Sequence, residues 1–422
     1  MEGQSSGSPS EQQCFEIKLA EMLQDVEPPE RYGFVNMQCI YRVQQRLRET
    51  NPKAYTPRIV SIGPFHKARD VDKEDKLESM EELKLKYLKG FLNRTQLPMN
   101  AFVVTLKSLE EMIRFFYAEP IKYNRDDFIK MILIDACFII ELFLRCNRYK
   151  EWEGKDPLLP KPWMLQEIYH DLILLENQLP FFVIDELYRV ADLKEEFPSF
   201  LEITLYFFNI RSFGTVSEVE YPEHFTDLLR TSIISSSQFH LIRARKEIKH
   251  LYTASQLLEA GLKFKASSKN CLVHLEYHGG VLTMPILNID DGTEILFRNI
   301  VAFEQSRLPH TPIIFEYLQI LDYLINTEKD VNILVDNKII VNRMGDANAV
   351  ATMVNSLSSY VTMPSINSKH FSDLCNSLND FYEKPRNKYK AIFIRMHAVS
   401  LGRKAFHDCI RVSQFYKETF VR

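Results

Sequence analysis

The chain has 422 residues, of which 45% are hydrophobic and 26% are charged, a balance typical of globular proteins. This length allows a large buried core and roughly two to three domains. The net charge of −4 supplies no overall positive field to hold a phosphate backbone, so we expect no nucleic-acid partner. Phe is frequent at 29 and Gly is scarce at 13, which favours packed helices over a sheet with many tight turns.

The cysteines and the N-terminus indicate a cytoplasmic protein without disulfides. The seven cysteines include no C-x-x-C pair, and most lie inside apolar runs, as buried free thiols do. Met1–Ser10 is small and polar, so we expect no signal peptide. No stretch reaches the ~18 consecutive apolar residues that cross a bilayer.

The first half of the chain has the apolar periodicity of helices. Residues 1–30 are expected to form a tail with one short helix, and residues 31–382 a large helical domain. Residues 127–146 are apolar almost all round, which is typical of a central buried helix. Pro180 should divide the helical stretch at 164–193 near Gln178. The other predicted helices of this half span 11–26, 40–49, 70–93, 99–116 and 197–208.

The second half is also mainly helical, with one change of character. Residues 271–277 alternate, His278-Gly279-Gly280 suits a turn, and 281–289 is apolar again, which predicts one small β-hairpin near 271–289. Pro285 should place the second strand at an edge. Predicted helices span 224–234, 254–260, 293–307, 313–327 and 346–360, with Gly261 ending one and Asp346 capping another. The predicted fold class is therefore mainly α, a single large helical unit.

Residues 383–422 form a separate basic segment. They contain ten Lys and Arg against three Asp and Glu, a net charge of about +7. Apolar side chains alternate with these cations, which fits an interfacial helix on an anionic membrane and equally an ordinary helix packed on the core. The residues expected to contact a membrane or partner are Lys388, Lys390, Arg395, Arg403 and Lys404.

One segment near the N-terminus combines turn chemistry with apolar anchors. Residues 40–66 contain I-Y-R-V and then A-Y-x-P-x-x-V-S-I-G-P-F-H. Four further blocks follow in order: I-D-A-C-F-I-I-E-L-F, D-L-I-L-L-E-N-Q-L-P-F-F-V, L-x-E-A-G-L-K-F-K and F-R-N-I-V-A-F-E-Q. Together these blocks resemble the plant family called domain of unknown function 247 (DUF247).

The resemblance implies a plant source, a mainly helical fold and no established enzymatic activity. Some relatives are linked to recognition, including self-incompatibility in grasses, and many carry a C-terminal transmembrane helix. Here the corresponding region is interrupted by Arg395, Arg403, Lys404 and Arg411, each costing ~2.5–3.5 kcal/mol at the centre of a membrane helix. Gln44 also stands where the family usually has proline.

Several polar residues interrupt the most apolar stretches. Asp135 and Glu141 are six residues apart, which places them about 120° apart around one helix. We interpret these carboxylates as members of a structural polar network that arginines neutralise. The network is predicted to comprise Arg42, Arg48, Asp135, Glu141, Glu176, Asn177 and Arg298.

No motif for nucleophilic, nucleotide-binding or metalloprotease chemistry occurs, and we expect no cofactor and no metal. His274 and His278 are four apart but fall on the predicted strand and turn, where this spacing gives no shared ligand geometry. The leading hypothesis is a non-enzymatic recognition protein with a protein partner, cytoplasmic or peripheral at the plasma membrane. One alternative is an enzyme that uses Asp135, Glu141, Glu176 and His66 in one pocket. Another is a degenerate family member without its membrane anchor.

Overall fold

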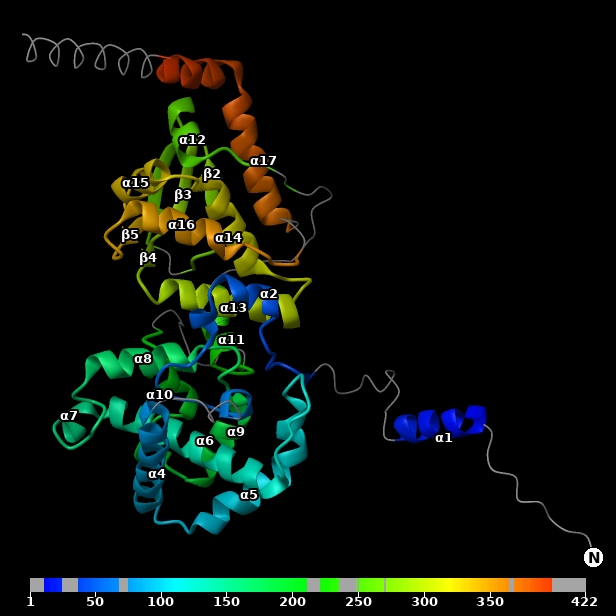
Figure 1. Ribbon diagram of the computed structural model, residues 1–422. Coiled ribbons are helices and arrows are strands. Elements are labelled where there is room, and N and C mark those ends of the chain that lie inside the picture. The colour runs from blue at the N-terminus through cyan, green and yellow to red at the C-terminus, as the bar shows by residue number, and fades with distance from the viewer. Residues whose placement is uncertain are drawn as a thin grey trace, which may run out of the picture. The chain divides into compact units, whose positions relative to one another are not determined.

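The computed structural model describes residues 11–24, 37–67, 75–210, 221–234, 248, 250–268, 271–363 and 368–396 (Figure 1). The chain divides into two compact units, Met1–Gln38 and Cys39–Arg422. The first unit contains helix α1 (Glu11–Gln24). The predicted domain limits at 30 and 382 remain predictions.

The N-terminal half of the second unit is a group of helices around one buried helix. All residues of α6 from Met131 to Arg145 are buried, and α4, α5, α9 and α10 pack against it. The helical stretch at 164–193 is divided as predicted, but α8 already ends at Leu172 rather than near Gln178. The elements are α2 (Gln45–Thr50), η2 (Pro52–Tyr55), α3 (Pro64–Lys67), α4 (Asp75–Thr95), α5 (Met99–Phe115), α6 (Arg125–Asn147), α7 (Tyr149–Trp152), α8 (Pro162–Leu172), α9 (Phe181–Val190) and α10 (Phe200–Phe207).

The C-terminal half combines helices with two small sheets (Figure 1). Residues 385–396 form a further helix after α17. The elements are α11 (Phe225–Ile234), α12 (Ala254–Ala260), β1 (Lys263–Ser267), β2 (Glu276–His278), β3 (Val281–Pro285), β4 (Leu287–Ile289), α13 (Thr293–Arg307), α14 (Ile313–Leu324), α15 (Glu328–Asp336), β5 (Ile340–Asn342), α16 (Ala347–Leu357) and α17 (Lys369–Glu383). The mainly α fold class is confirmed.

The predicted hairpin is present as β2 and β3, but the prediction for Pro285 is wrong. Strand β1 runs parallel to β3 on the side opposite β2, so β3 lies at the centre of the sheet. Pro285 is tolerated because it is the last residue of β3 and pairs with Ser267 at the end of the ladder. A second parallel pair, β4 with β5, was not predicted.

Helix α13 separates two hydrophobic cores. Its residues Ile295, Ala302 and Phe303 belong to the core around α6. Phe297, Ile300 and Val301 belong to the core formed by the C-terminal elements. A helix with apolar residues on both faces must be buried between the layers it joins, and α13 is the element through which the two cores meet.

Two predicted helix ends have the expected chemistry. Gly261 ends α12 with φ 102°, a left-handed conformation that a residue without Cβ adopts at little cost. Asp346 accepts hydrogen bonds from the backbone N–H groups of Asn348 and Ala349 at the start of α16.

Candidate functional site

A buried carboxylate, Glu176, holds the segment that contains the I-Y-R-V motif. Its Oε1 accepts hydrogen bonds from the Val43 backbone N–H at 2.7 Å and from Arg48 Nη2 at 2.5 Å. Its Oε2 lies 3.4 Å from His66 Nε2 and 3.9 Å from Arg42 Nη1. Because Glu176 is only 2% exposed, these neighbours replace the water that would otherwise stabilise its charge.

Asn177, the next residue of the loop between α8 and α9, holds the same segment by its backbone. Asn177 accepts from the Ile62 N–H at 2.7 Å and donates to the Val60 carbonyl at 3.0 Å. Gln178 instead braces the loop itself, because its Nε2 donates to the Leu172 carbonyl at 2.6 Å. The loop therefore supplies hydrogen-bond acceptors and donors to a segment that lies more than a hundred residues earlier in the chain.

Asp171, at the end of α8, adds three hydrogen bonds to the same N-terminal segment. Its carboxylate accepts the backbone N–H groups of Arg58, Ile59 and Val60 at 2.8, 2.7 and 2.8 Å. Burial raises the pKa of Asp171 to about 7, and the three N–H donors oppose that rise. Sequence reasoning missed Asp171 because its position within a helical pattern gives no sign of these distant donors.

Asp135 of α6 pairs with a buried lysine, Lys84, that the sequence did not suggest as its partner. It lies 2.8 Å from Lys84 Nζ and accepts the Gly63 backbone N–H at 2.9 Å. Gly63 has φ 71°, and a Cβ there would lie 2.6 Å from the Gln178 carbonyl oxygen, so glycine is required. Lys84 is 0% exposed although it sits in a charged stretch of α4 that resembles a solvated face.

Glu141 and Arg298 belong to two other groups of contacts. Glu141 accepts two hydrogen bonds from Arg94, at 2.9 and 3.0 Å, and one from Arg145 at 2.8 Å. Arg298 donates to Glu294 at 2.7 Å and to the Thr50 hydroxyl at 2.9 Å. Of the predicted network, the structure brings Arg42, Arg48 and Glu176 together. Asn177 follows Glu176 directly in the chain.

These contacts do not form one reactive centre. Of the four residues in the enzyme hypothesis, His66 and Glu176 are in contact, whereas Asp135 pairs with Lys84 and Glu141 with Arg94 and Arg145. All four side chains are buried. A general acid or base needs hydrogen-bond reach to a substrate, whereas Asp135, Glu141 and Glu176 each lie buried against a fixed cation.

A group that sequence reasoning did not identify is formed by Cys39, Glu223 and His224. Their potential ligand atoms lie within 4.8 Å of one another. However, His224 Nε2 lies 3.1 Å from the Cys39 carbonyl oxygen, and its Nδ1 accepts the Asp227 N–H at 3.2 Å. Glu223 pairs with Arg307 at 2.8 Å. Both imidazole nitrogens and the carboxylate therefore already have partners, which supports a packing role rather than metal binding.

Residues 385–396 carry the part of the predicted basic segment that the structure describes. Tyr389, Ile392, Phe393 and Met396 follow helical spacing and are 72%, 42%, 70% and 69% exposed. Arg395 pairs with Glu259 at 2.6 Å and Lys388 with Glu383 at 2.6 Å. Arg403 and Lys404 lie outside the described residues. No helix in the described part of the chain has both the length and the apolar character to cross a membrane.

These features define a mainly helical protein. The buried carboxylates in the part of the chain that the structure describes bind cations and backbone N–H groups of distant segments. Residues 40–402 match a plant protein family of unknown function, DUF247. The chain therefore belongs to this family.

Two relatives from Arabidopsis thaliana share most of their length with this chain. UPF0481 protein At3g47200 is 29% identical over 390 residues, which covers 85% of this chain and 80% of the relative. Putative UPF0481 protein At3g02645 is 22% identical over 428 residues, covering 78% and 79%. No solved structure matches the chain.

We predict that Arg48→Ala destabilises the protein by about 3 kcal/mol, because it leaves the buried Glu176 carboxylate without its nearest cation. Arg46→Ala is the matched control, since Arg46 is exposed on the same helix, α2, and should change stability by less than ~0.5 kcal/mol. Urea unfolding measures both. Equal stability of the two variants would contradict a structural role for the Arg48–Glu176 pair.

We predict that His224 makes the fold sensitive to acid. Burial lowers its pKa from 6.5 to about 4, so between these pH values the unfolded chain binds more protons and acid favours unfolding. From about pH 7.5 to about pH 5 this effect amounts to ~2 kcal/mol. His224→Gln keeps a neutral donor for the Cys39 carbonyl. Over the same pH range its free energy of unfolding, measured with urea, should therefore fall by ~2 kcal/mol less than that of the wild type. Parallel pH profiles for the two proteins would contradict the assignment.

Proposed function

We propose that this protein is a non-enzymatic interaction protein that acts in recognition, with a protein partner, at an anionic membrane surface on the cytoplasmic side. The non-enzymatic part of the proposal rests on one observation, that the buried carboxylates of the described residues serve as partners in structural ion pairs. Asp135, Glu141 and Glu176 each face a fixed cation in a buried site. This supports the proposal over the alternative of an enzyme built on these residues.

The helix at 385–396 supports the membrane part. Tyr389, Ile392, Phe393 and Met396 occupy positions i, i+3, i+4 and i+7 and thus share one side of the helix. Their exposed apolar surface resembles the inserting face of an interfacial helix. Because the aromatic and apolar groups are already at the surface, contact with the headgroup region requires no unfolding of the core.

The charge of the C-terminal segment supports an anionic partner surface. The segment 383–422 carries a net charge of about +7, and each Lys or Arg near an anionic leaflet contributes about 1 kcal/mol to attraction. An apolar stripe and a positive charge act together in peripheral binding, since neither signal alone gives stable attachment. The third hypothesis, a degenerate member without a membrane anchor, predicts no such attachment.

We predict that the full chain floats with vesicles of phosphatidylcholine and phosphatidylserine in a sucrose gradient, and that salt weakens this binding. The double variant Tyr389→Ser/Met396→Ser should lose most of it. Tyr206→Ser/Met99→Ser is the control, since Tyr206 and Met99 are exposed apolar residues at other places on the surface.

Retention of binding by the first double variant, or equal loss in both, would contradict the role of the stripe. Absence of flotation by the wild-type chain would contradict the membrane proposal and favour the degenerate member.

A further inference from the structure

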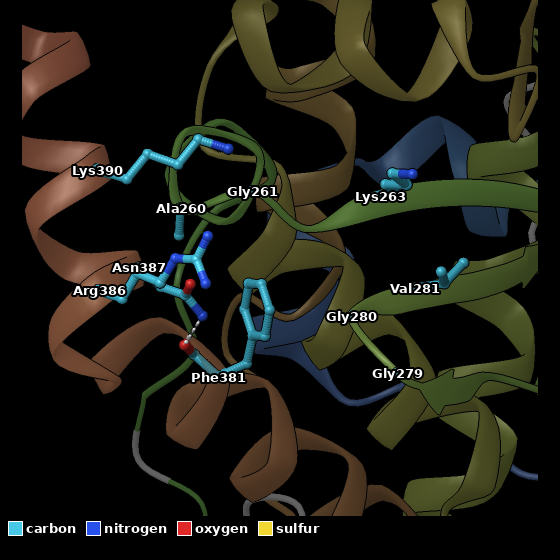
Figure 2. Close-up of a pocket in the computed structure, with 10 residues that line it drawn as sticks. All are labelled: Ala260, Gly261, Lys263, Gly279, Gly280, Val281, Phe381, Arg386, Asn387 and Lys390. Atoms are coloured by element: carbon cyan, nitrogen blue, oxygen red, sulfur yellow. Dashed lines mark hydrogen bonds between the residues drawn. The ribbon is translucent and has the colours of Figure 1, made fainter.

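A pocket of about 470 Å³ lies between the end of α12, the β2–β3 turn and the helix at 385–396. Figure 2 shows Lys390 extending from this helix toward Gly261, with Arg386, Asn387 and Phe381 beside it. The volume falls within the range of small-molecule sites, ~300–1,000 Å³, and exceeds what a single inorganic ion needs.

The pocket is positively charged. Lys263, Arg386 and Lys390 line it, and the described lining residues include no carboxylate. None of these three cations forms an ion pair with another described residue. Other cations of the same helix differ, because Lys388 pairs with Glu383 and Arg395 with Glu259. The pocket therefore faces Arg386 and Lys390 of this helix and Lys263 of β1, which have no ion-pair partner among the described residues.

Backbone without side chains forms one wall. Gly261, Gly279 and Gly280 have φ values of 102°, 57° and 81°, so the helix end and the two-residue hairpin turn both require glycine. A Cβ at Gly261 would lie 2.9 Å from Lys390 Nζ, and one at Gly280 would lie 3.4 Å from the Phe381 ring. At Gly261 the absence of a Cβ leaves room for the Lys390 ammonium, and the bare backbone of the three glycines lets a ligand approach it.

One further hydrogen bond fixes the opposite side of the pocket. Asn387 Nδ2 donates to the Phe381 carbonyl at 2.8 Å, as the dashed line in Figure 2 marks. This bond joins the start of the 385–396 helix to the end of α17. It holds Asn387 in place beside Arg386 and sets a polar group next to the apolar face of the Phe381 ring.

We propose that this pocket binds a phosphate monoester carried on a small molecule. A phosphate monoester is close to doubly charged at neutral pH, which suits several cations better than a single carboxylate does. Arginine offers planar paired donors and lysine a mobile point charge, the two groups that proteins combine on phosphates. The Phe381 ring gives the organic part of the ligand an apolar surface.

The same chemistry occurs on soluble inositol phosphates and on phosphoinositide headgroups. The inference stands apart from the membrane proposal, because the pocket uses Arg386 and Lys390 whereas the membrane stripe uses Tyr389 and its neighbours. Either one can fail while the other holds.

The test is isothermal titration of the full chain with inositol 1,4,5-trisphosphate, using Lys390→Ala and Lys388→Ala. These variants remove the same charge from the same helix, two residues apart, and only Lys390 lines the pocket. Loss of a charged hydrogen bond should weaken binding about tenfold or more in Lys390→Ala, and Lys388→Ala should stay within about twofold of the wild type. Circular dichroism checks that both variants are folded.

Absence of trisphosphate binding, or equal weakening in the two variants, would overturn the proposal. Vesicles of phosphatidylcholine with and without phosphatidylinositol 4,5-bisphosphate identify the source of the phosphate. Binding to the bisphosphate vesicles that soluble trisphosphate displaces indicates a lipid headgroup, and trisphosphate binding without vesicle binding indicates a soluble ligand. Both results support the phosphate-ester chemistry.

Discussion

The structure depends on one interaction, the hydrogen bonding of buried polar side chains at 171–178 to the backbone of residues 43–62. Asp171, Glu176 and Asn177 together accept five backbone N–H groups from that segment. An unpaired buried N–H costs about as much free energy as a lost hydrogen bond. A segment with little regular structure of its own can therefore lie in the interior only because these side chains replace a helix or sheet ladder.

The same segment also connects to the second core through α13. Asn299 accepts the Leu175 backbone N–H at 3.0 Å and donates to the Ala54 carbonyl at 2.8 Å. Arg298 reaches the Thr50 hydroxyl and the Ser356 hydroxyl, both at 2.9 Å. The residues before and after Pro52 thus meet one polar face of the helix that contributes to both cores. The I-Y-R-V region, the 171–178 loop and α13 are thus joined by one continuous set of hydrogen bonds, which we call the clasp.

Helix positions could be predicted because apolar spacing and local caps determine them. α12 and α13 have the predicted limits. Pro180 is the N-cap of α9, a position where its missing N–H removes no helical hydrogen bond. α2 begins at Gln45 rather than residue 40 because Val43 N–H bonds to Glu176 and Ile40 pairs with Tyr117. The pairing of β1 with β3 was missed since Lys263–Ser267 is short and its partner lies across a loop.

The polar network was predictable only in outline. Carboxylates in apolar stretches indicate that cations must lie nearby, but the sequence does not say which cations. Lys84 and Arg94 are on α4, whose charged spacing equally fits a solvated surface. The basic pocket escaped notice for a related reason, because a turn glycine at 261, a hairpin turn at 279–280 and a helix near 390 come together only in three dimensions.

The most direct test of the clasp is hydrogen–deuterium exchange by mass spectrometry on wild type and Asn177→Leu, which keeps a similar volume but removes the acceptor for Ile62 and the donor for Val60. We expect faster exchange in peptides that cover residues 58–63, while α15, which lies in the other core, keeps its wild-type protection. Unchanged exchange at 58–63 in a folded variant would contradict the claim that the 171–178 loop holds this segment.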